Sequence, residues 1–129
     1  WVRLAAAALG LGDSAVAELK DADLVHSDGR VVTVAYPFSG RPTRQQVELD
    51  VFPAVYAMCA IDALGIPVMA GRDARIAATD PRDGATVVVS VRGGRWRWTP
   101  SGAVVIFART ADCGTGCEVS PASNRNAFA

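Results

Sequence analysis

The stretch YAMCAIDALGIP, residues 56–67, carries one thiol and one carboxylate within an otherwise apolar run. Proline suits the first turn of a helix, which fits Pro53 just upstream, whereas glycine suits the residue just past a helix end, which fits Gly65. Pro67 lacks the N–H group that a continuing helix needs. We therefore predict a central helix from Pro53 to Leu64. Apolar side chains cover nearly all of its faces, so we expect this helix to be buried.

Cys59 and Asp62 are three residues apart, so on a helix they share one face, with Cβ atoms about 5–6 Å apart. Tyr56 precedes Cys59 by the same step and extends this polar stripe. The carboxylate of Asp62 can accept the thiol proton and leave a thiolate, which is the reactive form of cysteine. A carboxyl group that holds this proton can later donate it. The pair is therefore a candidate active site.

A purely structural interpretation of the same pair stays open. A lone cysteine on an apolar helix is usually a small core residue. A lone aspartate often caps a turn or pairs with an arginine, and Arg72 and Arg75 follow closely in the sequence. The single histidine, His26, lies in another predicted element beside a hairpin turn. We expect it at the surface rather than in a protease-like site of cysteine, histidine and aspartate.

Beyond Arg72 the hydrophobic pattern changes to a period of two, which is typical of strands. The turn segments DPRDG and RGG separate the first three of the predicted strands, and QVELDVF upstream of the helix is a further short strand. This pattern predicts an α+β fold in which an antiparallel meander packs on the central buried helix. The four strands of the meander are ARIAAT (74–79), ATVVVSV (85–91), RWRW (95–98) and AVVIFAR (103–109).

The N-terminal part reads as a helix followed by a hairpin. Asp13 and Ser14 are helix-starting residues, and apolar side chains then recur at helical spacing. The Asp28-Gly29 pair sits between two apolar runs, which is the usual sign of a tight hairpin. A helix followed by a hairpin resembles the second half of a winged helix, which we interpret as a packing appendage rather than a DNA reader.

The loop PFSGRPTRQQ, residues 37–46, is the candidate domain boundary because it is rich in proline, glycine and polar residues. We therefore divide the chain into a partial winged-helix-like part, residues 1–38, and an α+β core with an irregular C-terminal tail, residues 39–129. The opening residues 1–12 begin with Trp rather than Met and are expected to be a helix fragment rather than the remnant of a signal peptide.

Composition excludes several classes of protein. The chain has 129 residues, which suits one domain or one small domain with an appendage, and its 50% of hydrophobic residues suits a well-filled globular core. Thirteen basic side chains balance thirteen acidic ones, so a nucleic-acid partner is not favoured. The apolar run of residues 51–71 has the length of a membrane span, but Pro53, Asp62 and Pro67 interrupt it. We expect no membrane association.

Three cysteines are too few for a disulfide scaffold, and the odd number leaves at least one thiol unpaired. The cytoplasm, as a reducing compartment, is the simplest location. Two of the thiols, Cys113 and Cys117, lie in the segment CGTGC, which permits a metal half-site, a redox disulfide, or one ligand beside a bystander. A zinc site made of the three cysteines and His26 is weakly supported because these residues are dispersed along the chain.

Three pieces of the sequence, taken together, resemble the organomercurial (alkylmercury) lyase family. They are AYPFSGRPT (35–43), VYAMCAIDALGIPVMAGRDARIAATDP (55–81) and a strand ladder that ends in WTP and AVVIF. The most specific piece is Cys-Ala-x-Asp, preceded by an aromatic residue and followed by ALGIP. The resemblance runs from about residue 16 to residue 107. It implies a winged-helix-like N-terminal part joined to a core with this helix and antiparallel strands.

The resemblance also implies a reaction, the protonolytic cleavage of a carbon–mercury bond. Cys59 falls on the helix cysteine of the family and Asp62 on its catalytic aspartate. Mercury(II) is soft and prefers thiolate ligands, so Cys59 would bind it while Asp62 takes the thiol proton. A second thiolate would weaken the bond, and Asp62 would then protonate the carbon. The products would be a hydrocarbon and Hg(II) held on the thiolates.

The partners that the resemblance implies are a small organomercurial substrate or a thiophilic metal ion, with low-molecular-weight thiols removing the product and no organic cofactor. The family's second thiol often sits in an adjacent cysteine pair after the last core strand, whereas this chain has Cys113 and Cys117 and then the segment NAFA, a weak echo of the family's aromatic strand. Cys117 lies nearer the family's position. The alternative function is an inactive lyase-like thiol module that binds or senses mercury or another thiophilic metal.

Overall fold

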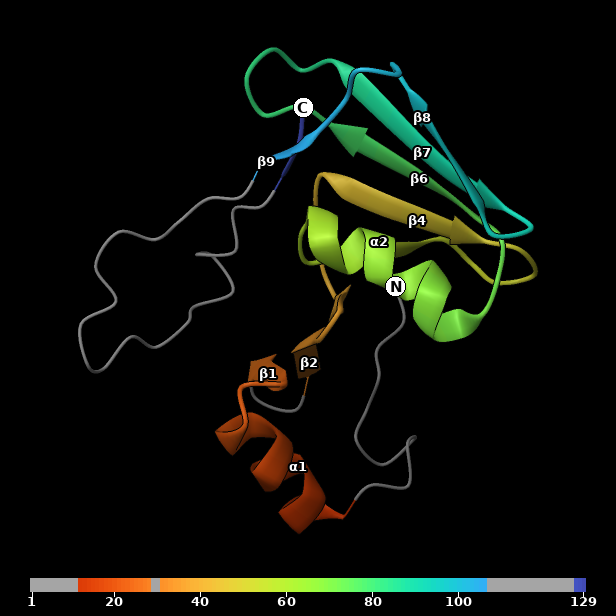
Figure 1. Cartoon of the computed structure of the whole chain (residues 1–129). Helices are drawn as coiled ribbons and strands as arrows, with labels where there is room; N and C mark the ends of the chain where they lie inside the picture. Colours follow the sequence, from red (N-terminus) through yellow and green to blue (C-terminus); the bar gives the residue numbers. More distant parts are fainter. Residues whose placement is uncertain (1–11, 29–30, 107–126) are drawn as a thin grey trace.

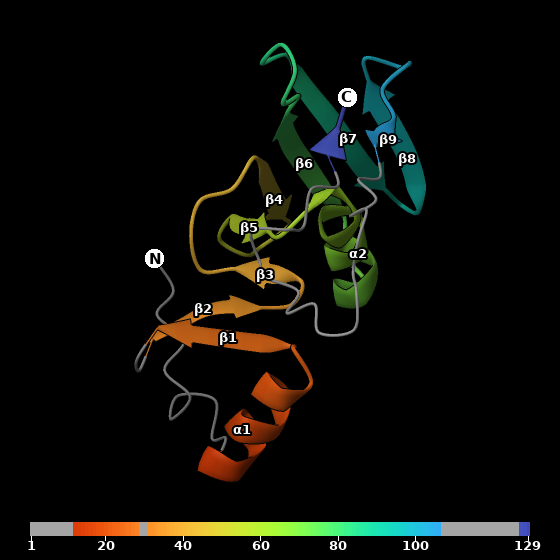
Figure 2. The ribbon, with the colours of Figure 1, turned by 90° about the vertical axis from the view of Figure 1, so that its left-hand side faces the viewer.

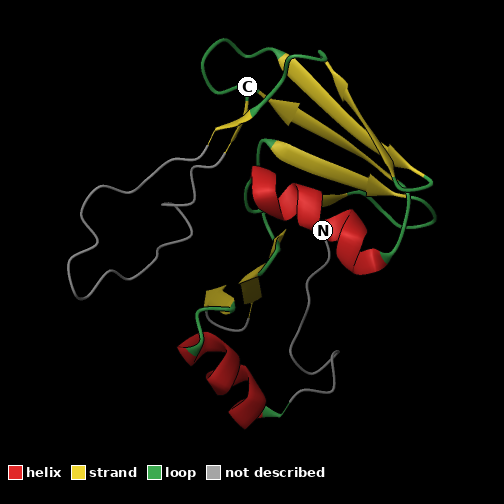
Figure 3. Ribbon diagram, viewed as in Figure 1, coloured by secondary structure: helices red, strands yellow, loops and turns green. Residues whose placement is uncertain are grey.

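The computed structural model describes residues 12–28, 31–106 and 127–129 of the chain. Within these residues, eight strands form one antiparallel sheet in the order β1-β2-β3-β5-β4-β6-β7-β8 (Figure 1). The strands are β1 (Val25–Asp28), β2 (Val31–Ala35), β3 (Phe38–Ser39), β4 (Gln45–Leu49), β5 (Val55–Ala57), β6 (Ala74–Thr79), β7 (Thr86–Arg92) and β8 (Arg95–Thr99). Figure 3 shows the second layer, helix α2 (Ala60–Ala70), lying against one face of this sheet. The predicted α+β fold is confirmed.

The core lies between α2 and the sheet. Alternate residues of the central strands point toward the helix, because successive side chains of a strand face opposite ways. Val47, Ile76 and Val89 lie side by side across β4, β6 and β7 and are all at most 1% exposed. Ile66 of α2 packs in the same cluster. Each such side chain stabilises the fold by about 1.5–3 kcal/mol when it leaves water.

The predicted central helix has the wrong boundaries. Residues 55–57 form β5, which fills the gap between β3 and β4, and the helix starts only after Cys59. Val55 and Tyr56 are residue types that favour strands, and pairing with two neighbours satisfies their backbone groups. Sheet pairing therefore overrides the helical reading of this segment.

The end of the helix also differs from the prediction, since Gly65 and Pro67 both lie inside α2. Proline removes one helical hydrogen bond, a cost that burial of its ring offsets here. The helix ends instead at Gly71, which has a left-handed φ of 60° and donates to the Val68 carbonyl. The expected burial holds only in part, because Ile61 within the predicted range is 41% exposed, and Val68 and Met69, beyond its predicted end, are 70% and 68% exposed.

The predicted meander is correct for β6, β7 and β8, which pair consecutively. Its fourth strand is not. Strand β9 (Val105–Ile106) leaves the large sheet and pairs with β10 (Ala127–Phe128) near the C-terminus. Phe128 is fully buried in the core, with its ring centroid 5.7 Å from that of Trp98. Burial of this large ring explains why Ala127 and Phe128, within the predicted irregular tail, form a strand.

The N-terminal helix and hairpin are confirmed. Helix α1 (Asp13–Asp21) packs against β1, and β1 pairs with β2 (Figure 2). The hairpin residues 29–30 and the opening residues 1–11 lie outside the described residues. Strand β3 falls inside the predicted loop 37–46, and its pairing with β2 and β5 makes the sheet continuous across residue 38. The winged-helix-like character and the division at residues 38 and 39 stay predictions.

None of the helices in the described part of the chain is long and apolar enough to cross a membrane.

Candidate active site

The first turn of α2 lies near the end of the sheet at which the central strand β4 begins. Strand β5 runs antiparallel to β4, so its last residue, Ala57, arrives beside the start of β4 at Gln45. The chain then turns and α2 runs back along β4 (Figure 1). This arrangement brings three segments together within the core: the end of β5, the start of β4 and the N-terminus of α2.

Cys59 is the residue that caps this N-terminus. Its backbone is extended, with φ −148° and ψ −178°, and its carbonyl accepts the Ala63 N–H at 2.9 Å. The side chain is a thiol that takes part in no disulfide, and it is only 3% exposed. The N-terminus of a helix carries the positive end of the helix dipole, which favours a negative charge such as a thiolate. The position therefore stabilises a thiolate once the thiol loses its proton.

Asp62 lies in the first turn of α2 and is half-buried. Burial raises the pKa of the Cys59 thiol above its ordinary value, and the Asp62 carboxylate, which accepts a hydrogen bond from the thiol, raises the pKa further. The backbone N–H groups of Asp62 and Ile61 act in the opposite direction.

The arrangement can therefore store a proton on the thiol and pass it to the adjacent carboxylate. A soft electrophile that binds sulfur would drive this transfer, because metal binding requires the deprotonated thiolate. Once the proton is gone, the N-terminal dipoles of α2 stabilise the charge on sulfur. Thiol capture with proton transfer is the chemistry that this pair of residues supports.

Thr43 holds the segment that leads into the site. Its hydroxyl donates to the Ala57 carbonyl at 2.7 Å and accepts the Gln45 N–H at 3.2 Å. These contacts tie the end of β5 to the start of β4, two residues before Cys59. Neither Thr43 nor Gln45 was identified from the sequence. The available signal was the period of two, which places Gln45 on the same strand face as the apolar Val47 and Leu49.

The remaining predicted residues fall in different places. Tyr56 is not on α2 and takes no part in a polar stripe, because it sits on β5 opposite Gln46. Both side chains line a separate, mostly apolar cavity of about 420 Å³. Cys113 and Cys117 lie outside the described residues, so their assignment stays a prediction.

The other predicted partners are engaged elsewhere. His26 is half-buried on β1, where Nε2 lies 2.9 Å from an Asp23 oxygen without hydrogen-bond geometry. Arg75 pairs with Glu48 at 3.5 Å and is not the partner of Asp62. No group of three metal-ligating side chains occurs among residues 12–28, 31–106 and 127–129.

These features define a thiol–carboxylate site at the N-terminus of a partly buried helix in an antiparallel α+β scaffold. The family model MerB, described as alkylmercury lyase, matches residues 38–128. The chain belongs to this family.

Among solved structures, the fold is similar to the crystal structure of the mercury-bound form of MerB2, with a TM-score of 0.65 and 24% sequence identity. The match covers 78% of this chain and 51% of that one, so this chain spans about half the length of its structural relative. A search of curated protein sequences found no match.

Proposed function

We propose that this chain carries the protonolytic centre of an organomercurial lyase, with Cys59 as mercury-binding thiolate and Asp62 as proton carrier. The observation that carries the proposal is the buried Cys59 thiol at the start of α2, hydrogen-bonded to the carboxylate of Asp62. The family match, which covers both residues, supports it.

In the proposed reaction, the Cys59 thiol binds the mercury of a small organomercurial and its proton passes to Asp62. A second thiolate then adds electron density to the metal and weakens the carbon–mercury bond. Asp62 protonates the departing carbon, which leaves as a hydrocarbon. Hg(II) stays on the thiolates until low-molecular-weight thiols remove it. The reaction needs no organic cofactor, and a cytoplasmic location is part of the proposal.

The second thiolate is proposed to come from Cys117 or Cys113. Soft mercury(II) is held by two thiolates in preference to one thiolate and a hard ligand. Separate Cys117→Ser and Cys113→Ser variants identify the contributor, because only one of them should lose benzene formation. Equal loss in both variants, or in neither, would contradict a single second thiol.

The test of the reaction is the release of benzene from phenylmercury in the presence of excess thiol. The wild type should release benzene, and Cys59→Ser should release none above background. Asp62→Asn should release it about 100-fold or more slowly, the scale of a lost general acid. Asp73→Asn removes a carboxylate at the opposite end of α2 and serves as the matched control. Benzene release that Cys59→Ser does not reduce would sink the proposal.

A second candidate function is a thiol module that binds mercury without cleaving the carbon–mercury bond. The feature that favours it is the spacing of Cys113 and Cys117, which stand apart where the family often has an adjacent pair. This candidate predicts stoichiometric retention of phenylmercury and no benzene. The same assay therefore separates the two functions.

A further inference from the structure

One buried polar side chain near the site makes no hydrogen bond within the described part of the chain. Gln45 is only 5% exposed, yet its side-chain amide takes part in none of the hydrogen bonds of the described residues. The contacts that Gln45 makes with Thr43 use its backbone atoms alone. Burying an amide without a hydrogen bond costs free energy, and nearly all buried polar groups in proteins are therefore paired.

The amide lies on the side of the sheet that faces α2. Gln45 shares this strand face with the buried Val47, and the β4–β5 register places it opposite Ala57. Ala57 packs in one cluster with Ala60 and Ala63 of the first helical turns. Cys59 follows Ala57 by two residues in the chain. Gln45 therefore lies in the same region of the core as Cys59.

The amide is also not fully enclosed. His26 Nε2 is the one fully enclosed side-chain polar atom without a hydrogen bond in the part of the chain that the structure describes. The amide of Gln45 is not among such atoms, so it keeps a narrow contact with solvent. An unpaired buried polar group requires an explanation, and a role in ligand binding or catalysis is one of those that proteins use.

We infer that Gln45 is a substrate-binding residue whose amide N–H donates to the ligand that leaves mercury when Cys59 captures the organomercurial. The inference rests on the proposed function. Organomercurials carry a second ligand X, such as a carboxylate, a hydroxide or a small thiolate, and each of these accepts hydrogen bonds. In the capture step the mercury–X bond breaks and the mercury–sulfur bond to Cys59 forms. The thiol proton passes to Asp62, and X departs as an anion.

A donor aimed at a developing negative charge stabilises the transition state more than the ground state. Gln45 therefore speeds capture and has no part in the later cleavage of the carbon–mercury bond. It also determines specificity, because it favours substrates whose second ligand is a good hydrogen-bond acceptor.

The test separates capture from cleavage. In a Cys113→Ser/Cys117→Ser background, Cys59 is the sole cysteine, and the substrate is the phenylmercury adduct of thionitrobenzoic acid, whose thiolate is coloured once released. Gln45→Met should release this thiolate about tenfold more slowly than the background protein, the scale of one lost hydrogen bond to a charged group. Gln46→Met is the matched control, because the neighbouring side chain faces the other side of the sheet.

Thermal unfolding supplies the second readout. Since Gln45→Met removes an unpaired buried amide, its Tm should equal or exceed that of Gln46→Met. Equal release rates in the two variants, or a lowered Tm in Gln45→Met, would overturn the inference. Absence of capture with Gln45 intact would overturn the inference and the proposed function together. Capture that depends on Gln45, with no benzene formed by the protein that retains all its cysteines, would leave the inference standing and remove the lyase activity.

Discussion

The thiol of Cys59 and the carboxylate of Asp62 share a hydrogen bond across the first turn of α2, and the helix places both at its positive end. The Asp62 carboxylate and the N-terminus of the helix have opposite effects on the pKa of the thiol. The carboxylate keeps the proton on the thiol, whereas the N-terminal dipoles favour the thiolate. With these opposite effects, the thiol stays protonated until an electrophile binds to the sulfur.

The first prediction concerns the pH at which Cys59 becomes reactive. Burial and the Asp62 carboxylate both raise the pKa of the thiol, which lies above its ordinary value of 9.0, so alkylation by iodoacetamide should accelerate with a midpoint above pH 9.0. Asp62→Asn removes the charge while the backbone dipoles stay, and the midpoint should move to lower pH. The measurement is the alkylation rate against pH in the Cys113→Ser/Cys117→Ser background. Asp73→Asn should leave the midpoint in place, and an unmoved midpoint in Asp62→Asn would contradict the role given to its carboxylate.

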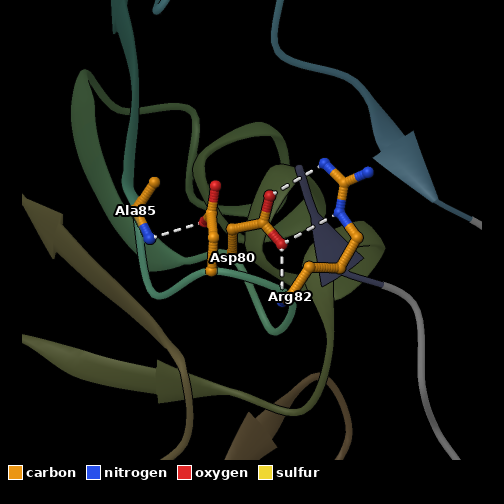
Figure 4. Close-up of polar contacts among 4 residues, drawn as sticks. Asp80, Arg82 and Ala85 are labelled. Carbon is orange, nitrogen blue, oxygen red and sulfur yellow. Dashed lines mark hydrogen bonds and ion pairs between the residues drawn. The ribbon is translucent and has the colours of Figure 1, made fainter.

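The second prediction concerns acid stability at the β6–β7 turn (Figure 4). The side chain of Arg82 and its backbone N–H both donate hydrogen bonds to the buried carboxylate of Asp80. These bonds, the side-chain bond above all, lower the pKa of the Asp80 carboxyl below its ordinary value of 3.8. A lowered pKa means that the unfolded chain binds the proton more tightly, so the stabilisation is present above pH 3.8 and is lost as the pH falls through the native pKa. Asp80→Asn should therefore lower Tm at neutral pH, and its difference from the wild type should shrink in acid.

Asp83→Asn is the control for this turn. The exposed Asp83 accepts the Ala85 N–H at 2.8 Å, and an asparagine oxygen can accept the same bond. Its Tm should follow that of the wild type across the pH range. A Tm difference for Asp80→Asn that is as large in acid as at neutral pH would mean that the charge of Asp80 is not what stabilises the turn.

The third prediction separates two glycines of the same helix. Gly71 has a left-handed φ of 60°, so Gly71→Ala should destabilise the protein by about 1–2 kcal/mol through backbone strain alone. Gly65 lies inside α2 with open space at its Cβ position, so Gly65→Ala should stabilise the protein by about 0.5–1 kcal/mol. Urea unfolding measures both. The same sign for the two substitutions would show that the helix does not end where the structure places it.

The fourth prediction tests whether the C-terminal strand belongs to the core. Phe128→Ala should cost about 3–5 kcal/mol, because it removes a fully buried ring in contact with Trp98. Phe52→Ala, at a ring that is 56% exposed, should change stability by no more than about 0.5 kcal/mol. Denaturant unfolding of the two variants gives the comparison. A loss for Phe128→Ala as small as that for Phe52→Ala would place β10 outside the cooperative core.

Local patterns were sufficient for the strands whose residues alternate. In β6 and β7 every second residue is apolar, so the period itself states which side faces the core. The pairing of β1 with β2 could also be predicted locally, because turn residues separate two apolar runs. The pattern misled at residues 53–58, where apolar residues follow one another without alternation. A run of this kind does not distinguish a buried strand from a buried helix.

The proximity of Cys59 and Asp62 was determined by the sequence alone, because residues three apart meet in a helical turn whether the first lies inside the helix or caps it. Only the tertiary structure decided that Cys59 is the capping residue, since this depends on β5 pairing with β3 and β4. It likewise decided that Gln45, fourteen residues earlier in the chain, borders the same site. Strand register brings such distant residues together, and register results from the packing of the whole sheet rather than from any short segment.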